Sequence, residues 1–168
     1  VLFRSYARRA GYETVGRAGE TLSDHWAEGM RTLHGMHEHG FPNLFVMQPN
    51  QGANLISNIT HNFVEGNITM ATVVRHALDI GADVVDADAV AEDAWVALLE
   101  GTTRGFLGSP ECTPGYYNNE GRPIGRRERL NGSGYPEGAA AFFRYIADWR
   151  ISGRFEGLGF SAASDRKS

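Results

Sequence analysis

The sequence is poor in the features that define several common protein classes. It has a single cysteine, Cys112, in 168 residues, which excludes an intrachain disulfide framework and indicates a reducing compartment such as the cytoplasm. No apolar run approaches the roughly 18 residues that a membrane span requires, and no signal peptide is visible. We therefore expect a protein that has no membrane partner.

An excess of one sign of charge is also lacking. The chain has 20 acidic and 16 basic residues and a net charge of −4 at pH 7, with the two signs interspersed. The densest cationic run, Arg126-Arg127-Glu128-Arg129, contains its own carboxylate. Binding to a phosphate backbone requires a basic stripe or patch, so the sequence argues against a nucleic-acid partner.

Several catalytic motifs are missing as well. No GxGxxG dinucleotide-binding motif occurs, and the nearest pattern, Gly153, Gly157 and Gly159, has the wrong spacing and follows a predicted helix rather than a strand. No Ser–His–Asp arrangement stands out. Cys112 has no positively charged neighbour that would favour its thiolate, so we interpret it as a packed, inert thiol. We expect no catalytic residue in this chain.

Glycine and apolar residues are abundant instead. The chain has 21 glycines in 168 residues, well above the usual ~7%, and 42% of its residues are hydrophobic. That apolar content is sufficient for the core of one domain. The glycine content is typical of an α/β protein with many tight turns.

Hydrophobic patterning predicts strands and three helices. The run Leu44-Phe45-Val46-Met47 lies between turn signals and is typical of a fully buried strand of a parallel sheet. Helices are predicted over 57–79, 89–106 and 136–151, with a last strand over 155–160. The inner stripes predicted for the three helices are, in order, Ile59, Phe63, Met70, Val74 and Leu78; Val90, Ala94, Trp95, Leu98 and Leu99; and Phe142, Ile146 and Trp149.

Residues at the helix ends support these boundaries. Asp86 and Asp88 are expected to cap the second helix rather than bind a metal. Pro136 is expected in the first turn of the third helix, and Gly153 lies just past its end. The order of strand, loop and long helix predicts an α/β fold with a loop at the carboxyl end of a parallel sheet.

Loop 48–58, QPNQGANLISN, is the strongest candidate site on physical grounds. It follows the predicted buried strand and leads into a helix whose first N–H groups are unsatisfied and partly positive. Open α/β sheets bind their ligands at such a place. The alternative is an ordinary turn between a strand and a helix.

The histidines of HGMHEHG, His34, His37 and His39, invite a metal interpretation, with Glu38 as a fourth ligand. A stand-alone module that binds a metal or a small molecule through these histidines is therefore one alternative function. However, structural zinc sites usually recruit cysteine, and alternate residues of an extended His-Glu-His segment point to opposite sides. We therefore expect no metal site.

Three segments carry a resemblance to one enzyme family. They are GFPNLF at 40–45, loop 48–58 with its Pro49 and Ser57-Asn58, and CTPGYYNNEGR at 112–122. Together they resemble the C-terminal part of the Baeyer–Villiger monooxygenases, flavoproteins with two dinucleotide-binding domains. This family uses FAD, NADPH and O2 to oxidise ketones to esters or lactones. A related flavin monooxygenase that oxidises nitrogen or sulfur is the alternative within enzymes.

The resemblance covers about residues 6–160 and implies a Rossmann-like α/β fragment that lacks the GxGxxG half. The fragment would be the last third of a full enzyme and inactive alone, its partners being a ketone, O2 and the remainder of its own polypeptide. Residues 1–5 match poorly and are expected to be non-native. Residues 6–108 would be the returning segment of the FAD-binding domain, 109–160 a C-terminal lid and 161–168 a disordered tail.

The resemblance also implies roles for individual residues, by their position in the family pattern. Those expected at FAD are Asn54, Leu55, Asn58 and Ile59; those on the NADP side are Thr113, Tyr116 and Asn118; those at the substrate are Leu55, Ile56, Tyr116 and Tyr117. The run Asn50-Gln51-Gly52-Ala53 departs from the Gly/Ser/Pro-rich version of the loop, which affects the expected shape of the substrate pocket. The TPGYYNNEG version of the third segment is typical of a subgroup that includes enzymes for bulky ketones.

Overall fold

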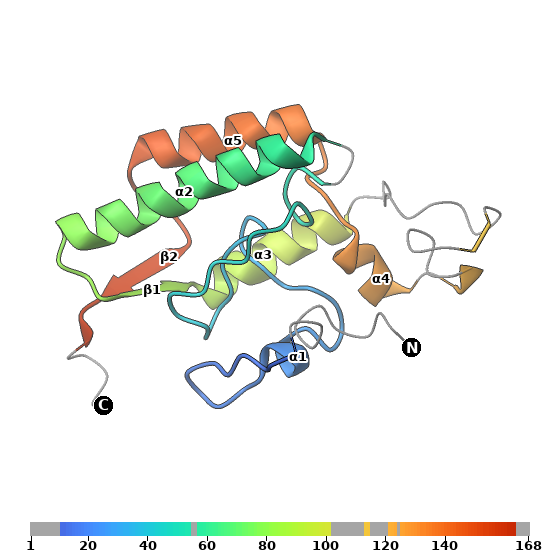
Figure 1. Ribbon diagram of the computed structural model, residues 1–168, viewed down its shortest axis with the longest axis horizontal. Helices are drawn as coiled ribbons and strands as arrows, with labels where there is room; N and C mark the ends of the chain where they lie inside the picture. The colour runs from blue at the N-terminus through green and yellow to red at the C-terminus, as the bar shows by residue number, and fades with distance from the viewer. Residues whose placement is uncertain (1–10, 55–56, 102–112, 115–120, 124, 164–168) are drawn as a thin grey trace.

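The computed structural model describes residues 11–54, 57–101, 113–114, 121–123 and 125–163. Its elements, in chain order, are α1 (Leu22–His25), α2 (Ile59–Asp79), β1 (Val84–Ala87), α3 (Ala89–Glu100), α4 (Arg126–Asn131), α5 (Ala139–Ser152) and β2 (Leu158–Ser161). Helices α2 and α5 pack side by side, and α3 and the two strands lie below them (Figure 1). The long loop that precedes α2 runs through the middle of the molecule.

The two strands form an antiparallel pair in which Val84 lies opposite Ser161 and Ala87 lies opposite Leu158. The last strand was expected over 155–160, and the structure places it three residues later at its start. The partner strand β1 was not predicted, because its apolar run is short and is followed by acidic residues. The mixed α/β class is correct, but the described residues contain no parallel sheet.

Residues 44–47 are not a strand in the described part of the chain, so the prediction of a paired strand there is wrong for this structure. The physical reason is that none of the described residues forms a strand beside this segment. The N–H of Val46 donates to the carbonyl of Met36 at 2.9 Å, and that of Leu44 donates to Phe41 within a turn. The apolar pattern correctly predicted a partly buried segment, but a strand also requires a ladder of backbone hydrogen bonds to a neighbouring strand.

Helices α2 and α3 begin within two residues of the predicted positions, but α3 ends at Glu100, six residues before the predicted end at 106. The side chain of Asn58 caps α2 by accepting from the N–H of His61, and that of Asp88 caps α3 by accepting from the N–H of Ala91. Helix α5 begins at residue 139 rather than 136. Residues 135–138 form a turn in which the N–H of Gly138 donates to the carbonyl of Tyr135, so Pro136 lies before the helix.

The inner stripe of α5 is confirmed, since Phe142, Ile146 and Trp149 are all buried. That of α3 is correct at Trp95 and Leu99, but the other three predicted positions are exposed: Val90, Ala94 and Leu98. The stripe predicted for α2 is wrong. The buried positions of that helix are Thr69, Val73 and Ala77, whereas those predicted as buried are largely exposed: Ile59, Phe63, Val74 and Leu78. Helix α2 is apolar on two sides, so periodicity alone could not select the buried one.

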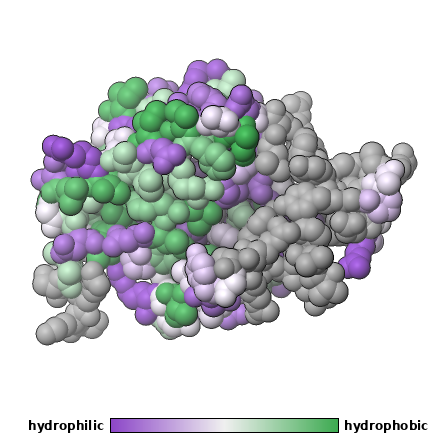
Figure 2. Space-filling view, viewed as in Figure 1, coloured by the Kyte–Doolittle hydropathy of each residue, from purple (hydrophilic) through white to green (hydrophobic). Residues whose placement is uncertain are grey.

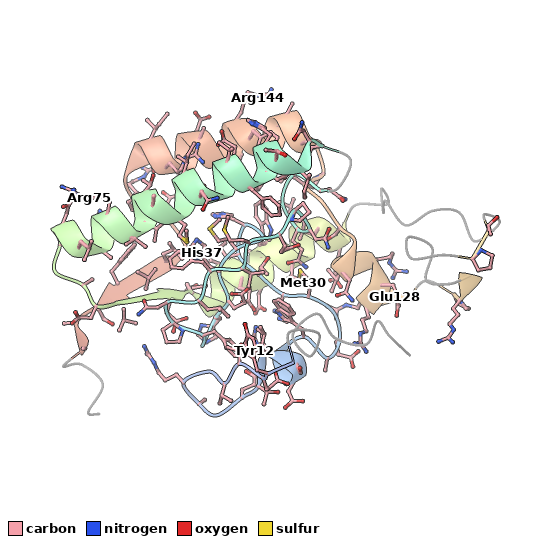
Figure 3. The ribbon with its side chains drawn as sticks, viewed as in Figure 1. Tyr12, Met30, His37, Arg75, Glu128 and Arg144 are labelled. Carbon is pink, nitrogen blue, oxygen red and sulfur yellow. The ribbon has the colours of Figure 1, made fainter. Side chains whose placement is uncertain are left out.

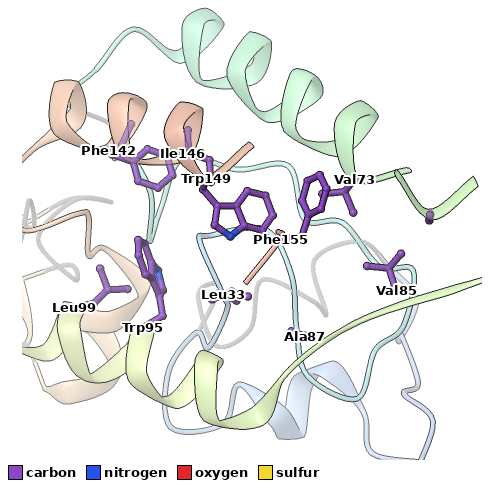
Figure 4. Packing of buried hydrophobic residues seen from close by; sticks show 12 residues of the cluster. Leu33, Val73, Val85, Ala87, Trp95, Leu99, Phe142, Ile146, Trp149 and Phe155 are labelled. Carbon is purple, nitrogen blue, oxygen red and sulfur yellow. The ribbon is translucent and has the colours of Figure 1, made fainter. Parts of the chain in front are cut away.

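The main core lies between α5, α3 and the central loop (Figure 4). Trp149 packs edge-on against Phe155, with their ring centroids 5.2 Å apart, and Trp95 stacks on Tyr145 at 5.6 Å. A second, smaller cluster surrounds α1 and contains Leu22, Trp26, Met30 and Phe41. Within the described segments, no helix is both long and apolar enough to cross a membrane.

Two glycines with positive φ give a matched test of packing between α3 and the turn before β2. A Cβ on Gly157 would lie 2.9 Å from a methyl carbon of Leu33 and 3.0 Å from the Cβ of Ala91, whereas one on Gly153 would meet nothing within 4 Å. We expect Gly153→Ala to lower the free energy of unfolding by about 1 kcal/mol through backbone strain. Gly157→Ala should cost about 3 kcal/mol because overpacking is added. Urea denaturation measures both, and equal losses would contradict the close contact.

Candidate functional site

The first part of loop 48–58 is fixed by one buried side chain, that of Gln51. Its carboxamide oxygen accepts from the Thr32 hydroxyl at 2.6 Å, and its NH2 group donates to the Met30 carbonyl at 2.6 Å and to the Leu130 carbonyl at 3.3 Å. Its backbone N–H donates to Ser133 and its carbonyl accepts from the indole of Trp95. Gln51 is fully buried, and both its side chain and its backbone are hydrogen-bonded.

Neighbouring residues of the loop make further bonds to the same surroundings. The carbonyl of Gly52 accepts from the N–H of Tyr135 at 2.8 Å, and the Asn54 side chain donates to the carbonyl of Gly132 at 3.0 Å. The Gln48 side chain donates to the carbonyl of Gly35 at 3.2 Å. Residues 48–54 are thus held between the 30–35 segment and the segment that follows α4.

This anchored loop leads to an open helix end. Asn58 and the first residues of α2 are exposed. The Asn58 side chain satisfies the N–H of His61, and the Asn58 carbonyl accepts from Asn62. Within the described residues, the N–H groups of Ile59 and Thr60 have no acceptor. The positive end of a 21-residue helix is therefore available to a polar or negatively charged group.

A pocket lies behind the loop, between α2 and α5, and encloses about 470 Å³ including its open mouth. Its walls are mainly apolar and include Met47, Phe63, Phe142 and Ile146. The polar part of the wall includes Glu65, which makes an ion pair with Arg150 at 2.8 Å.

The three histidines of HGMHEHG make separate contacts and do not form one site. His34 hydrogen-bonds the Tyr145 hydroxyl at 2.8 Å and packs edge-on against Trp95 and Trp149. The imidazole of His39 pairs with the Ala87 carbonyl. Met30 and His37 also lie in the interior (Figure 3). Among the residues the structure describes, no group of three His, Cys, Asp or Glu side chains is arranged to hold a metal.

Burial lowers the pKa of both His34 and His37 to about 3, and for His34 the nearby His37 adds to the effect. Both imidazoles are therefore neutral at physiological pH. Because unfolding restores the ordinary value of 6.5, acidification below that value favours the unfolded chain. Each of the two groups removes up to about 1.4 kcal/mol of stability per pH unit between the two pKa values.

Two buried glutamates have opposite electrostatic surroundings. Neither carboxylate oxygen of Glu38 has a hydrogen-bond partner, and burial, with the nearby Glu92, raises its pKa well above the usual range. Burial acts in the same direction on Glu92. There, however, hydrogen bonds from His25 and from the N–H of His39, with the charges of His25 and Arg31, lower its pKa overall. For His25, burial lowers the pKa, but the partnership with Glu92 raises it overall.

The structure describes only some of the residues that the resemblance implied for the site. Asn54 is buried and its side chain is bonded to Gly132, so it supports the loop from inside. Asn58 and Ile59 lie exposed at the start of α2, and Thr113 is also exposed. The remaining expected site residues lie outside the described residues: Leu55, Ile56, Tyr116, Tyr117 and Asn118.

Sequence reasoning missed the structural importance of Gln51, Glu38 and Glu92. Gln51 appeared only within a run that departs from the family pattern, and a glutamine in a loop is usually exposed. Glu92 was not singled out, because a glutamate on a helix is usually exposed. Its position in the sequence could have pointed to Gln51. It lies four residues after the predicted buried strand 44–47, where the backbone of a buried loop needs hydrogen-bond donors and acceptors from nearby side chains.

Comparison with known proteins finds similar sequences, each of which matches this chain over a part of its own length. Pentalenolactone D synthase of Streptomyces arenae is 40% identical over 154 residues, which are 91% of this chain and 26% of that protein. A Baeyer–Villiger monooxygenase of Streptomyces coelicolor is 45% identical over 138 residues, which are 80% of this chain and 22% of that protein. An FAD-binding monooxygenase of Hypomyces subiculosus is 35% identical over 152 residues, 90% of this chain and 25% of that protein. No protein-family profile matches the chain.

Two solved monooxygenase structures contain a segment with the same fold as this chain. The polycyclic ketone monooxygenase of the fungus Thermothelomyces thermophila superposes with a TM-score of 0.76 at 28% identity, covering 94% of this chain and 25% of that one. A steroid monooxygenase with bound NADP shares the fold, with a TM-score of 0.72 at 22% identity over 90% of this chain and 26% of that one. This chain thus spans about a quarter of the length of the relatives it matches, less than the third expected.

The opposite surroundings of Glu38 and Glu92 predict opposite effects of the same substitution. In the folded chain Glu38 stays protonated above its ordinary pKa of 4.5, so stability falls as the pH rises from that value to the raised pKa. We expect Glu38→Gln to remove this loss, by up to about 1.4 kcal/mol per pH unit. Glu92→Gln should instead destabilise the chain at neutral pH, because a stabilising ionised carboxylate is lost.

Free energies of unfolding at pH 5, 6, 7 and 8 check both variants. The expected result is a Glu38→Gln curve that rises relative to the unsubstituted chain as the pH increases, and a Glu92→Gln curve that falls below it. Parallel curves for Glu38→Gln would show that this carboxyl group is ionised in the folded chain.

Proposed function

Because the chain is homologous to a segment of the Baeyer–Villiger and related type I flavin monooxygenases, we propose that it is part of an FAD- and NADPH-dependent ketone monooxygenase. The complete enzyme would use O2 to convert a ketone into an ester or lactone. The observation that carries the proposal is the identity of 45% to a Baeyer–Villiger monooxygenase over 80% of this chain. The chain alone covers 22% of that protein, so the activity would belong to a longer polypeptide.

The residues of the described site fit a flavin. The N–H groups of Ile59 and Thr60 are open at the positive end of α2, and such an end favours the polar, partly negative edge of a flavin ring. Asn58, Ile59 and the neighbouring Leu55 and Ile56 would hold the ring and line the substrate side. FAD with NADPH would supply the oxidation chemistry when bound.

The contribution of this chain would be binding, orientation and exclusion of water. Gln51 and Asn54 fix the loop from inside, which keeps the helix end and the loop backbone in one position without an induced rearrangement. Among the described residues at the helix end, His61 is the one titratable side chain, and its ring packs edge-on against Phe143. Exclusion of water by the loop and the lid would protect the reaction from unproductive loss of oxidising equivalents.

Residues 109–160 would contribute the lid. In the proposed enzyme Thr113, Tyr116 and Asn118 lie on the NADP side, and Tyr116 and Tyr117 line the entrance for the substrate. Tyrosine suits such a boundary because it combines a large apolar ring with a hydroxyl that can hydrogen-bond. The TPGYYNNEG segment would then favour a bulky ketone.

The test compares the 168-residue chain with the longer polypeptide produced from the same gene. We expect the chain alone to bind neither FAD nor NADPH at micromolar concentration, because it has no phosphate-binding GxGxxG turn. The longer polypeptide should copurify with FAD and oxidise NADPH in the presence of a bulky cyclic ketone. Its product should be the lactone, carrying one atom of ¹⁸O from labelled O2.

Flavin fluorescence, equilibrium dialysis and mass spectrometry of the product provide the readouts. Micromolar binding of FAD by the 168-residue chain would overturn the fragment interpretation. A flavin-loaded polypeptide that oxygenates an amine or a thioether but no ketone would assign the chain to the alternative reaction.

A further inference from the structure

The pocket between α2 and α5 has room for small molecules only. Of the 470 Å³ that it encloses with its open mouth, about 40 Å³ can hold the centre of a water-sized molecule. One such molecule needs roughly 10–15 Å³ of this space, so about three fit. A bulky ketone or a nicotinamide ring is too large. The occupant of this pocket is therefore a molecule of a few heavy atoms at most.

Apolar side chains from three parts of the fold make most of the wall. Phe63 comes from α2, and Phe142 and Ile146 come from α5. Met36 and Met47 come from the segments that precede α2, and methionine adapts its shape to what it contacts because its side chain is unbranched and polarisable. Apolar residues also gather on the surface over this part of the molecule (Figure 2). The pocket thus favours an apolar molecule.

The polar side chains in the wall already have hydrogen-bond partners within the protein: His34, Gln48, Asn62, Glu65 and Thr69. Glu65 and Thr69, for example, are both bonded to Arg150. The Nδ1 atom of His34 has no partner among the described residues, but the ring is neutral because burial lowers the pKa of His34 to about 3. A cavity with few free polar groups stays dry and takes up apolar molecules.

Glycine keeps the cavity open at two places. A Cβ on Gly66 would lie 2.8 Å from the Met47 methyl carbon and 3.5 Å from that of Met36. One on Gly52 would lie 3.0 Å from the Phe142 ring. Gly66 is in the interior of α2, where glycine weakens a helix relative to alanine. At this position the chain therefore has less helix stability and more room for a ligand.

The cavity lies directly behind the open helix end of the candidate flavin site. Its wall includes Gly52 and Ala53 of loop 48–58. Phe63, also in the wall, follows Ile59 by four residues, which is about 6 Å along the axis of a helix. The proposed function involves FAD, NADPH, a ketone and O2, and of these only O2 is both apolar and small enough for this cavity.

We propose that the pocket between α2 and α5 binds dioxygen and supplies it to the flavin site at the start of α2. The proposal rests on the proposed function for the use of O2. The binding is noncovalent, and no bond is made or broken within the pocket. It raises the local concentration of O2, because an apolar gas partitions from water into a dry apolar cavity. Supply from behind the loop leaves the substrate side of the loop free for the ketone.

Xenon tests the site because it is an apolar gas that binds in dry cavities. The longer polypeptide carries ¹³C-labelled methionine methyl groups, and their NMR signals are followed as the xenon pressure increases. We expect saturable shifts of the Met36 and Met47 signals, which Met36→Leu and Met47→Leu assign. The indole N–H of Trp26, which lies in the separate cluster around α1, is the internal reference and should not shift. The absence of a saturable shift at Met36 and Met47 would overturn the proposal.

Substitution of Gly66 tests whether the shifts come from this cavity. Gly66→Ala should weaken xenon binding at least about tenfold, because the added methyl group occupies the cavity. Gly101→Ala is the matched control at the end of α3, where a Cβ would be in ordinary contact, 3.5 Å from the Leu98 carbonyl oxygen. It should change xenon binding less than about twofold. Because the Met47 side chain can move aside, Gly66→Leu is a second variant that fills the cavity more completely. Unchanged xenon binding in both Gly66 variants would overturn the assignment.

Oxygen kinetics test the supply of dioxygen. The longer polypeptide is loaded with FAD and reduced by NADPH, and its reaction with O2 is measured by stopped flow at several O2 concentrations. Gly66→Ala should lower the second-order rate constant at least about threefold, because less O2 is held beside the flavin. The rate of flavin reduction by NADPH should stay within about twofold, and Gly101→Ala should leave both rates within that range. Equal O2 rate constants for the two variants would overturn the proposal.

The outcomes separate this proposal from the proposed function. A polypeptide that oxidises ketones but shows no xenon binding at Met36 and Met47 would keep the function and reject the dioxygen site. A polypeptide that binds xenon there but contains no flavin would reject the function, and the supply of dioxygen with it. Competition between a cyclic ketone and xenon for the same methionine signals would assign the pocket to the substrate and overturn dioxygen as the occupant.

Discussion

The buried carboxamide of Gln51 is the interaction on which the rest of the structure depends. It bonds the Met30 carbonyl and the Thr32 hydroxyl in one segment and the Leu130 carbonyl in another, and so joins its own loop to two segments that are distant in the sequence. These bonds allow an irregular loop to lie in the interior, because a buried loop is stable only if its polar groups find partners. The position of the α2 start, and with it the candidate flavin site, follows from that loop.

The two sides of this loop differ in how fully their polar and apolar groups find partners among the described residues. On the side toward α3 and α4, Gln51 and its neighbours find hydrogen-bond partners within the chain. On the side toward segment 44–47 and the outer face of α2, backbone groups and apolar side chains lack partners among the described residues. This asymmetry is expected of one segment of a larger fold, and it agrees with the quarter-length match to the related monooxygenases.

Sequence reasoning predicted the elements that depend on local physics. Capping by Asp88 and the buried stripe of α5 could be predicted because a cap needs only nearby N–H groups and α5 has a single apolar side. Asp86, which was also expected to cap α3, lies in β1 and accepts from the N–H of Gly40 instead. The buried side of α2 could not be predicted, since both sides of the helix are apolar and only packing against the neighbouring elements decides which of them is buried. The antiparallel pair and the role of Gln51 depend on contacts between distant segments, such as the bond from Gln51 to Leu130. The family resemblance supplied the chemistry, which no residue of this chain specifies alone.

The comparison of Gln51→Glu with Gln51→Met most directly tests the claim that this amide holds the loop. Glutamate keeps the shape but presents oxygen to the carbonyls of Met30 and Leu130, whereas methionine removes the bonds without adding a charge. The account predicts that Gln51→Glu lowers the free energy of unfolding by about 2 kcal/mol or more beyond the loss caused by Gln51→Met, because a buried charge would face two acceptors. Equal losses for the two variants, or no loss for either, would contradict it.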